Sequence, residues 1–276
     1  MSWLDFKDQD SLVIDPLYVD IRGKGTETLV FIAGLGGTTR YWESRLQSIE
    51  GRYRIVLVDL LGFGRSPKPW MQYTVERQVA ALHDAIQSFA PFTLVGHSLG
   101  ALIAVAYAAE HPEKVKNIVP IGMPYFGSEA AAYRYMRGGS VQGGFVYTSV
   151  ALTMITCILT RRLFGWLLPY IIRSVPREVA EDLVKHTWRS STSSLWDVVY
   201  RYDIRSDLER LPTRIRPLFI HGDEDIMAPV GAIEGLVRDH PAWRVEVRPG
   251  IDHHPFLRDP AGCLALIESL QTSELS

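Results

Sequence analysis

The chain has 276 residues, 47% of them hydrophobic, which is enough for one large α/β domain with a sizeable core. Its 29 basic and 31 acidic residues nearly balance, and this argues against a nucleic acid partner. The first ten residues, MSWLDFKDQD, lack the pattern of a secretory signal, and Cys157 and Cys263 fit buried thiols in a reducing compartment. We therefore expect a cytoplasmic protein without a disulfide framework.

Short apolar segments typical of buried parallel strands alternate with helical patterns along most of the chain. Residues 11–23 contain two alternating runs that predict an antiparallel hairpin at the start of the sheet. The strands expected after this hairpin span residues 28–34, 53–60, 92–97, 116–122, 216–223 and 243–250. Helical patterns such as residues 74–89 lie between them. The alternation predicts an α/β fold with a mostly parallel central sheet covered by helices on both faces.

The alternation stops between about residues 125 and 205, where helical patterns continue but no strand is indicated. An insertion at this point would lie over the carboxyl ends of the strands, where open α/β sheets bind ligands. We therefore expect a first core part at 1–124, a helical lid at 125–205 and a second core part at 206–276.

The pentapeptide Gly-His-Ser-Leu-Gly, with Ser98 at its centre, follows the strand at 92–97 and precedes a helical pattern. Glycines two residues before and after Ser98 suit a sharp turn from strand to helix that exposes a nucleophilic hydroxyl. The alternative is that Ser98 is an ordinary helix cap, which needs no second glycine. A nucleophilic serine also needs a base and a third group that orients the base.

A carboxylate and a histidine are available after two later strands. The segment HGDEDIMAP follows residues 216–220 and offers Asp223, Glu224 and Asp225, while IDHHP follows residues 243–250 and offers His253 and His254. The chain order serine, acid, histidine is the order of the α/β-hydrolase arrangement.

With these motifs the chain resembles α/β-hydrolases of the lidded, cofactor-free type over nearly its whole length. FIAGLGGTTRYW resembles the oxyanion loop of that family, VDLLGFGRS its Asp-x-x-Gly-x-Gly-x-Ser loop, and GHSLG its nucleophile elbow. HGDEDIMAP and HHPFLRDP resemble its acid and histidine loops. The resemblance implies an inserted α-helical lid on the α/β-hydrolase fold.

The resemblance also implies roles for individual residues. It makes Ser98 the nucleophile, Asp225 the acid and His253 the base, with Asp223, Glu224 and His254 as the alternatives. Backbone N–H groups of Leu35 and Leu99 would form the oxyanion hole. We expect Asp223 to cap its own turn instead.

Two positions depart from the family pattern. Ala33 and Gly34 stand where many relatives have His-Gly, which removes a loop-stabilising histidine but leaves the backbone donor in place. Asp252 stands where the family usually has glycine before the histidine, so its carboxylate either raises the pKa of His253 or faces solvent.

Cofactors and metals are not indicated. The segment GLGGTTR lacks the Gly-x-Gly-x-x-Gly register and the Lys-Ser/Thr of a P-loop, so we expect no nucleotide cofactor. Asp252, His253 and His254 are the types of residue that bind metals, but adjacent residues rarely converge on one ion. We therefore expect no metal.

The apolar composition of the inserted segment indicates which kind of substrate the protein would bind. Residues 145–160 have no charge, yet sixteen residues are short for a membrane span, which needs about twenty. We interpret them as a lid helix between the catalytic core and the substrate; the alternative is a lid that leans on a membrane to collect a lipid-like substrate. Either interpretation implies an apolar substrate. Four aromatic residues would line the wall of the substrate pocket or pack in the core of the lid: Trp166, Tyr170, Trp188 and Trp196.

Serine at the elbow indicates acyl chemistry, because the related epoxide hydrolases and haloalkane dehalogenases carry aspartate there. We expect a carboxylesterase-like hydrolase that cleaves an apolar ester or thioester through an acyl-enzyme on Ser98. Carbon–carbon bond hydrolases, acyltransferases and perhydrolases share the same residues, as do ligand receptors with this fold. A non-hydrolytic cyclase in a biosynthetic pathway is the remaining alternative.

Overall fold

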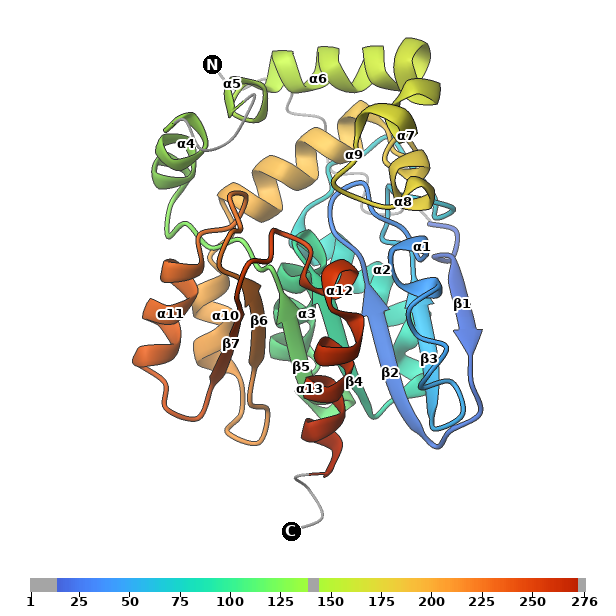
Figure 1. Ribbon diagram of the computed structural model, residues 1–276, viewed down its shortest axis with the longest axis vertical. Coiled ribbons are helices and arrows are strands. Elements are labelled where there is room, and N and C mark those ends of the chain that lie inside the picture. The colour runs from blue at the N-terminus through green and yellow to red at the C-terminus, as the bar shows by residue number, and fades with distance from the viewer. Residues whose placement is uncertain (1–13, 139–143, 273–276) are drawn as a thin grey trace.

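The computed structural model describes residues 14–138 and 144–272, and its seven strands form one sheet (Figure 1). The strand order is β1-β3-β2-β4-β5-β6-β7. The strands are β1 (Val19–Arg22), β2 (Glu27–Ile32), β3 (Tyr53–Val58), β4 (Phe92–His97), β5 (Val115–Ile121), β6 (Leu218–Gly222) and β7 (Arg244–Arg248). Strand β1 is antiparallel to β3, and the other neighbouring pairs are parallel. The predicted mostly parallel sheet is therefore confirmed.

The junction between β5 and β6 differs from the other parallel pairs. Its register consists of one pair, Ile121 opposite Ile220, whereas β6 and β7 are paired along five positions. The N–H of Gly122 continues the contact and donates a hydrogen bond of 2.9 Å to the carbonyl of Ile220. The two strands thus meet at their carboxyl ends, where the chain leaves the sheet after β5 and returns to it at β6.

The predicted hairpin at residues 11–23 is wrong in its described part. Residues 14–18 form no strand, and β1 pairs with β3, with Val19 opposite Val58. Pro16 stands between the two apolar runs and has no N–H to donate to a ladder, which disfavours a hairpin there. Residues 11–13 of this prediction lie outside the described residues.

Helices cover both faces of the sheet (Figure 1). One face carries α2 (Val75–Ile86), α3 (Leu99–Glu110), α10 (Ile204–Arg210) and α11 (Val230–Arg238); the other carries α1 (Arg40–Glu43), α12 (Pro255–Arg258) and α13 (Pro260–Thr272). Strand side chains alternate between these layers: on β2, Val30 and Ile32 pack with the first group, and Leu29 and Phe31 with the second. Because both faces are covered, the central strands β2, β4 and β5 are almost entirely buried, whereas the edge strands β1 and β7 carry charged residues and are partly exposed.

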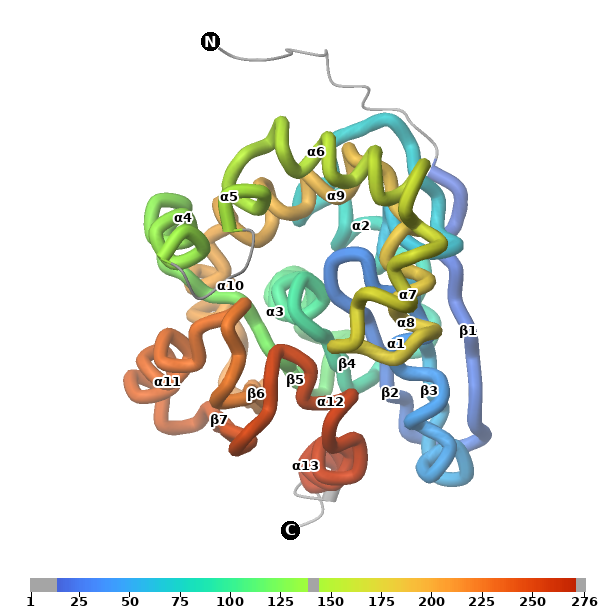
Figure 2. The backbone as a smooth tube through the Cα atoms, turned by 45° about the horizontal axis from the view of Figure 1, so that its top comes forward, coloured from blue at the N-terminus to red at the C-terminus, as the bar shows by residue number. Residues whose placement is uncertain are grey.

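In the described residues between β5 and β6, the chain forms helices and no strand. The helices before α10 are α4 (Glu129–Arg137), α5 (Gly144–Tyr147), α6 (Val150–Leu159), α7 (Leu168–Ile171), α8 (Arg177–Asp182) and α9 (Trp188–Ser193). This segment also contains the π-helical Thr160–Phe164 and Ser194–Tyr200 and the 3₁₀ turn Gly165–Leu167. Two further 3₁₀ turns, Gln87–Phe89 and Pro112–Lys114, lie before β5. Figures 1 and 2 show α4 to α9 arching over the carboxyl ends of the strands, around the region above α3.

The inserted helices have a small apolar core of their own. Ala132 and Met136 of α4 pack there with Leu195, Trp196 and Tyr200 of the π-helical segment. This separate core gives the insertion internal order, while its role as a lid stays a prediction.

Both cysteines are free, as expected. Cys263 is buried in the layer of α13, but Cys157 on α6 is only half-buried.

Candidate active site

Ser98 occupies a strained turn between β4 and α3. Its φ of 52° and ψ of −117° lie in a region of backbone conformation that residues other than glycine rarely adopt. Among the described residues, Ser98 is the only non-glycine residue with a positive φ. Although Ser98 directly precedes α3, its side chain makes no capping hydrogen bond to the helix. The interpretation of Ser98 as an ordinary capping residue is therefore wrong.

The two glycines of the pentapeptide permit the close approach of strand and helix at this turn. A Cβ atom on Gly96 would lie 2.2 Å from the carbonyl oxygen of Gly100. A Cβ atom on Gly100 would lie 2.6 Å from the carbonyl oxygens of Ile32 and Ala33 on the neighbouring strand β2 and its loop. Any larger residue at either position would push α3 away from the sheet and displace Ser98.

A continuous chain of hydrogen bonds joins Ser98, His253 and Asp225. The Oγ atom of Ser98 lies 2.9 Å from Nε2 of His253, and Nδ1 of His253 lies 2.8 Å from Oδ2 of Asp225. The three residues follow β4, β7 and β6, so the parallel sheet brings their loops to one edge. This geometry lets the histidine accept the serine proton while the carboxylate holds the opposite ring nitrogen.

The carboxylate of Asp225 is buried and fully partnered. Its Oδ1 accepts the backbone N–H groups of Met227 at 2.8 Å and Ala228 at 2.9 Å. Its Oδ2 also lies 3.3 Å from Nε2 of His221. Burial raises the pKa of Asp225, but the hydrogen bonds from His221 and His253 outweigh it and bring the pKa below its usual range. Asp225 therefore stays ionised beside His253.

The alternative acids lie away from the histidine. Asp223 is exposed and accepts the N–H of Gly250 at 2.7 Å, so it ties its loop to the end of β7 instead of capping its own turn as predicted. Glu224 is exposed. The structure therefore places Asp225, and not Asp223 or Glu224, next to His253.

The alternative base, His254, points elsewhere. Its Nδ1 lies 3.4 Å from the hydroxyl of Tyr41, and burial, followed by the nearby His253, lowers its pKa to about 3. Asp252 accepts the backbone N–H of His254 at 3.0 Å and pairs with Arg258 at 2.5 Å. The carboxylate that replaces the usual glycine is therefore engaged by Arg258 and is not a partner of the His253 ring.

His97, the second residue of the pentapeptide, contacts the backbone of His253. Its Nε2 lies 2.8 Å from the backbone carbonyl of His253, and its ring stacks on Tyr41 at 4.6 Å. Burial first, and then the charges of His253 and His254, lower the pKa of His97 well below its usual range. A neutral His97 donates its Nε2–H to that carbonyl. No role of His97 was predicted from the sequence, although its place beside Ser98 was a signal.

The two predicted oxyanion donors belong to the residue after Ser98 and to the loop after β2. Leu99 is the first residue of α3, so its N–H has no acceptor within the helix. Leu35 lies in the loop after β2, where Gly37 donates to Gly34 at 2.9 Å. A Cβ atom on Gly34 would lie 2.9 Å from Cβ of Ser98, so this loop passes directly next to the serine.

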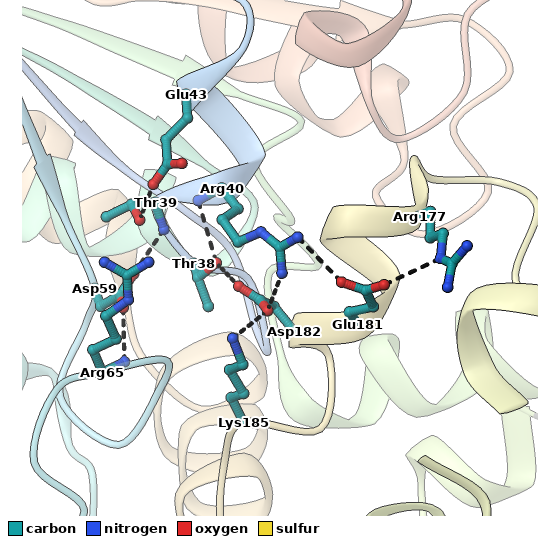
Figure 3. A network of polar contacts seen from close by, with 10 residues as sticks. All are labelled: Thr38, Thr39, Arg40, Glu43, Asp59, Arg65, Arg177, Glu181, Asp182 and Lys185. Carbon is teal, nitrogen blue, oxygen red and sulfur yellow. Dashed lines mark hydrogen bonds and ion pairs between the residues drawn. The ribbon is translucent and has the colours of Figure 1, made fainter. Parts of the chain in front are cut away.

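The loop that carries Leu35 is fixed from one side by Asp59, the aspartate of the segment VDLLGFGRS. The buried Asp59 accepts the N–H of Thr39 at 2.7 Å and the N–H of Arg65 at 2.8 Å (Figure 3). Burial raises the pKa of Asp59 in spite of these hydrogen bonds. The motif marked this residue in the sequence, but its contact with the loop after β2 was not predicted.

On its other side the same loop is held by Asp182, at the end of α8 (Figure 3). Asp182 is buried and accepts the hydroxyl of Thr38 at 2.6 Å. It also pairs with Arg40 at 2.9 Å and with Lys185 at 2.6 Å. The neighbouring Glu181 pairs with Arg40 at 3.1 Å. The inserted helices are thus anchored to the loop next to Ser98.

The four aromatic candidates for the substrate wall are not brought together. Trp166 and Tyr170 are 71% and 60% exposed, and the half-buried Trp188 packs edge-on against Trp70. Trp196 is buried, and its indole N–H donates to the hydroxyl of Tyr133 at 2.6 Å. Trp196 is therefore part of the core of the insertion.

A cavity of about 340 Å³ lies between the segment after β5 and the segment that leads into α10. Its walls come from residues 124–129, residues 199–204 and Leu102 of α3. None of the four aromatic candidates lines it, because Trp166 and Tyr170 face outward and Trp196 packs behind Tyr200.

Comparisons with known proteins agree with this architecture. A family model described as alpha/beta hydrolase fold matches residues 27–140. The chain is 27% identical to the probable lysophospholipase BODYGUARD 1 of Arabidopsis thaliana, over 91% of this chain and 60% of that protein. The chain thus spans about three fifths of the length of the first curated relatives it matches.

Two solved structures share the fold at low sequence identity. A bromoperoxidase from Bacillus anthracis and an esterase from Exiguobacterium antarcticum both superpose with a TM-score of 0.74. They are 22% and 21% identical to the chain, and each alignment covers 92% of this chain and 95% of the other.

Proposed function

Because the chain belongs to the α/β-hydrolase fold family, we propose that it is a serine hydrolase that cleaves an apolar carboxylic ester through an acyl-enzyme on Ser98. The observation that carries this proposal is the continuous hydrogen-bond chain from Ser98 through His253 to Asp225. A serine hydroxyl becomes a strong nucleophile when a neighbouring base takes its proton, and this arrangement supplies the base.

In the first half of the reaction, Oγ of Ser98 attacks the ester carbonyl carbon while Nε2 of His253 takes the hydroxyl proton. The carbonyl oxygen becomes an oxyanion, which the N–H groups of Leu35 and Leu99 stabilise by hydrogen bonds. Asp225 stabilises the imidazolium that forms. His253 then returns the proton to the leaving alcohol as the ester C–O bond breaks, which leaves an acyl group on Ser98.

In the second half, His253 takes a proton from water, and the resulting hydroxide attacks the acyl-enzyme carbonyl. The same two N–H groups stabilise the second oxyanion. As that intermediate collapses, the carboxylic acid leaves and His253 returns the proton to Oγ of Ser98. The low pKa of Asp225 supports both halves, because an ionised carboxylate keeps Nδ1 of His253 protonated and Nε2 free to accept.

For the substrate we propose a lipid-like ester with a single long acyl chain. The curated relative named a probable lysophospholipase supports this choice, since its name refers to an ester of that class. A thioester would react through the same steps.

The nucleophile is tested with a fluorophosphonate probe and mass spectrometry of the labelled peptide. We expect the wild-type chain to be labelled on Ser98 and the Ser98→Ala variant to remain unlabelled. The two adjacent histidines provide a matched pair: His253→Gln should reduce the labelling rate by about 10³ or more, and His254→Gln by less than about tenfold. Labelling at another residue, or equal losses for both histidine variants, would contradict the assignment.

The substrate class is tested with p-nitrophenyl esters of graded acyl length, acyl thioesters and lysophospholipids. Sustained turnover that increases with acyl length is expected. A single burst followed by almost no turnover would favour a ligand receptor, and activity that survives in Ser98→Ala would favour a non-hydrolytic cyclase. Transfer of the acyl group to an added alcohol in preference to water would indicate an acyltransferase.

A further inference from the structure

The outer surface of the inserted helices is unusually apolar. Of the fourteen large hydrophobic side chains that are exposed in the described residues, eleven lie between Phe145 and Ile171. We refer to the exposed side chains of α6, α7 and the turns that join them as the α6–α7 face. In Figure 1 the helix α6 lies at the outer end of the molecule, above α9, and α7 follows it beside α9. An exposed apolar surface of this extent normally marks a site of contact with a protein or a membrane.

The charges around the α6–α7 face identify its partner. Between Glu129 and Glu178 the sequence contains six arginines, no lysine and no acidic residue, although the whole chain has a formal net charge of −2. Arg161 and Arg162 lie within the apolar surface, and both are exposed. Neither forms an ion pair with any residue in 14–138 or 144–272. Unpaired arginines beside apolar and aromatic side chains suit an anionic phospholipid surface.

The aromatic side chains support the same partner. Trp166 and Tyr170 are among the most exposed large side chains of the face. The indole N–H of Trp166 donates to the carbonyl of Leu163 at 3.1 Å, so the ring can enter an apolar layer without losing its hydrogen bond. Tryptophan and tyrosine are enriched where a membrane meets water.

The position of the arginines distinguishes a surface contact from a membrane span. Residues Val150–Ile171 form a helical stretch of 22 residues with a mean hydropathy of 1.4, long enough to cross a bilayer. In a span, however, Arg161 and Arg162 would lie at its middle, and each would disfavour insertion by about a hundredfold. Figures 1 and 2 also show that the chain turns between α6 and α7. A bent segment with charges at its bend suits the plane of the headgroups.

We propose that the α6–α7 face docks the protein onto a membrane surface that contains anionic phospholipids. The apolar side chains enter the boundary between headgroups and acyl chains, and Arg161 and Arg162 contact phosphate groups. Because the inserted helices are anchored through Asp182 to the loop beside Ser98, docking places the catalytic edge of the sheet toward the membrane. This inference goes beyond the hydrolysis proposed above and does not depend on it.

The test is sedimentation of the full chain with vesicles of phosphatidylcholine alone or with about 30% phosphatidylglycerol, at about 0.05 M and about 0.5 M NaCl. We expect binding to the anionic vesicles that weakens at the higher salt concentration. The double variant Arg161→Gln/Arg162→Gln should bind the anionic vesicles about 30-fold more weakly. The double variant Leu163→Gln/Ile171→Gln should lose at least about tenfold on both kinds of vesicle.

Matched controls carry the same substitutions at exposed sites outside the face. Ile21→Gln on β1 and Arg238→Gln on α11 should leave vesicle binding unchanged. The two double variants of the face should also keep wild-type turnover of a water-soluble short ester, which shows that they fold. Binding is measured in Ser98→Ala as well, so that hydrolysis of the lipid does not affect the result.

Three results would overturn the docking proposal. They are no binding to anionic vesicles, binding that neither double variant reduces, and a dimer in analytical ultracentrifugation that the Leu163→Gln/Ile171→Gln variant converts to a monomer. The last result would make the face a contact between two copies of the chain. If vesicles bind but Ser98 is not labelled by the fluorophosphonate, docking stands and the proposed hydrolase activity fails. If Ser98 is labelled but vesicles do not bind, the hydrolase activity stands and docking fails.

Discussion

Replacing Asp182 by alanine tests whether this carboxylate anchors the inserted helices to the loop beside Ser98. The side chain is 3% exposed and contacts Thr38, Arg40 and Lys185. Removing one member of a fully buried ion pair costs about 3–5 kcal/mol. Arg40 and Lys185 are 27% and 43% exposed, so water compensates them in part, and we expect a loss of about 2–3 kcal/mol in the free energy of unfolding.

The assay for Asp182→Ala is thermal unfolding followed by circular dichroism, together with ester turnover. In a chain of this length, a loss of about 2–3 kcal/mol lowers the Tm by roughly 6 °C. Displacement of the loop that carries Leu35 should also lower kcat by about tenfold, with a smaller effect on KM.

Glu181 provides the matched control for Asp182, because it is the preceding residue on α8 and also pairs with Arg40. Its side chain is 38% exposed and its ion pair is screened by water, so Glu181→Ala should lower the Tm much less than Asp182→Ala and leave kcat unchanged. Equal Tm values for the two variants would refute the anchoring role of Asp182. A Tm loss in Asp182→Ala with unchanged kcat would show that the anchor stabilises the insertion but does not position the oxyanion loop.

Two further predictions concern the carboxylates. Asp225→Asn should lower kcat by about 10⁴ while the protein stays folded, because the amide favours the wrong tautomer of His253; a loss below about tenfold in stopped-flow ester assays would contradict this. The pKa of Asp182 is lowered in the folded state by its hydrogen bonds from Lys185 and Thr38, which outweigh burial. Its stabilising effect is therefore present above about pH 4 and decreases as the pH falls further. The Tm difference between wild type and Asp182→Asn should be larger at pH 7 than near pH 3, and a constant difference would exclude the mechanism.

Most of the sheet could be predicted because its strands are buried on both faces and therefore read as short apolar runs. The strands from β2 to β7 appear within two residues of their predicted starts, and no strand forms in the described part of the insertion. The pairing of β1 could not be predicted in the same way, because the free edge of β3 lies 31 residues or more along the chain from β1. Alternation alone identifies a strand but not its neighbour.

The candidate triad could be predicted because each of its members lies in a short motif in the loop after a strand. The rule that the carboxyl ends of parallel strands meet brings the three loops together, and the family resemblance selected Asp225 and His253 from the neighbouring candidates. Asp182 carries no such signal: its partner Thr38 is 144 positions away, and the segment around it reads as an ordinary helix. His97 lay inside the motif, but its donation to the backbone of His253 depends on a turn that brings the two loops into contact.

The aromatic residues of the insertion show a different limit of the sequence. A tryptophan in an apolar helical segment has the same pattern whether it faces a pocket, a core or solvent. Trp196 lies in the core of the insertion because it packs with α4, whereas Trp166 lies in the turn after α6 and faces outward. Periodicity cannot report that packing.

The single register pair between β5 and β6 divides the sheet into two parts. Strands β1 to β5 form one plate of the sheet, and β6 with β7 form a second. The two plates pair with each other near Ile121 and Ile220. Ser98 belongs to the first plate, and Asp225 and His253 to the second. The pair lies at the carboxyl ends of the two strands, next to the reacting atoms and away from the amino ends. It therefore fixes Ser98 of the first plate relative to Asp225 and His253 of the second.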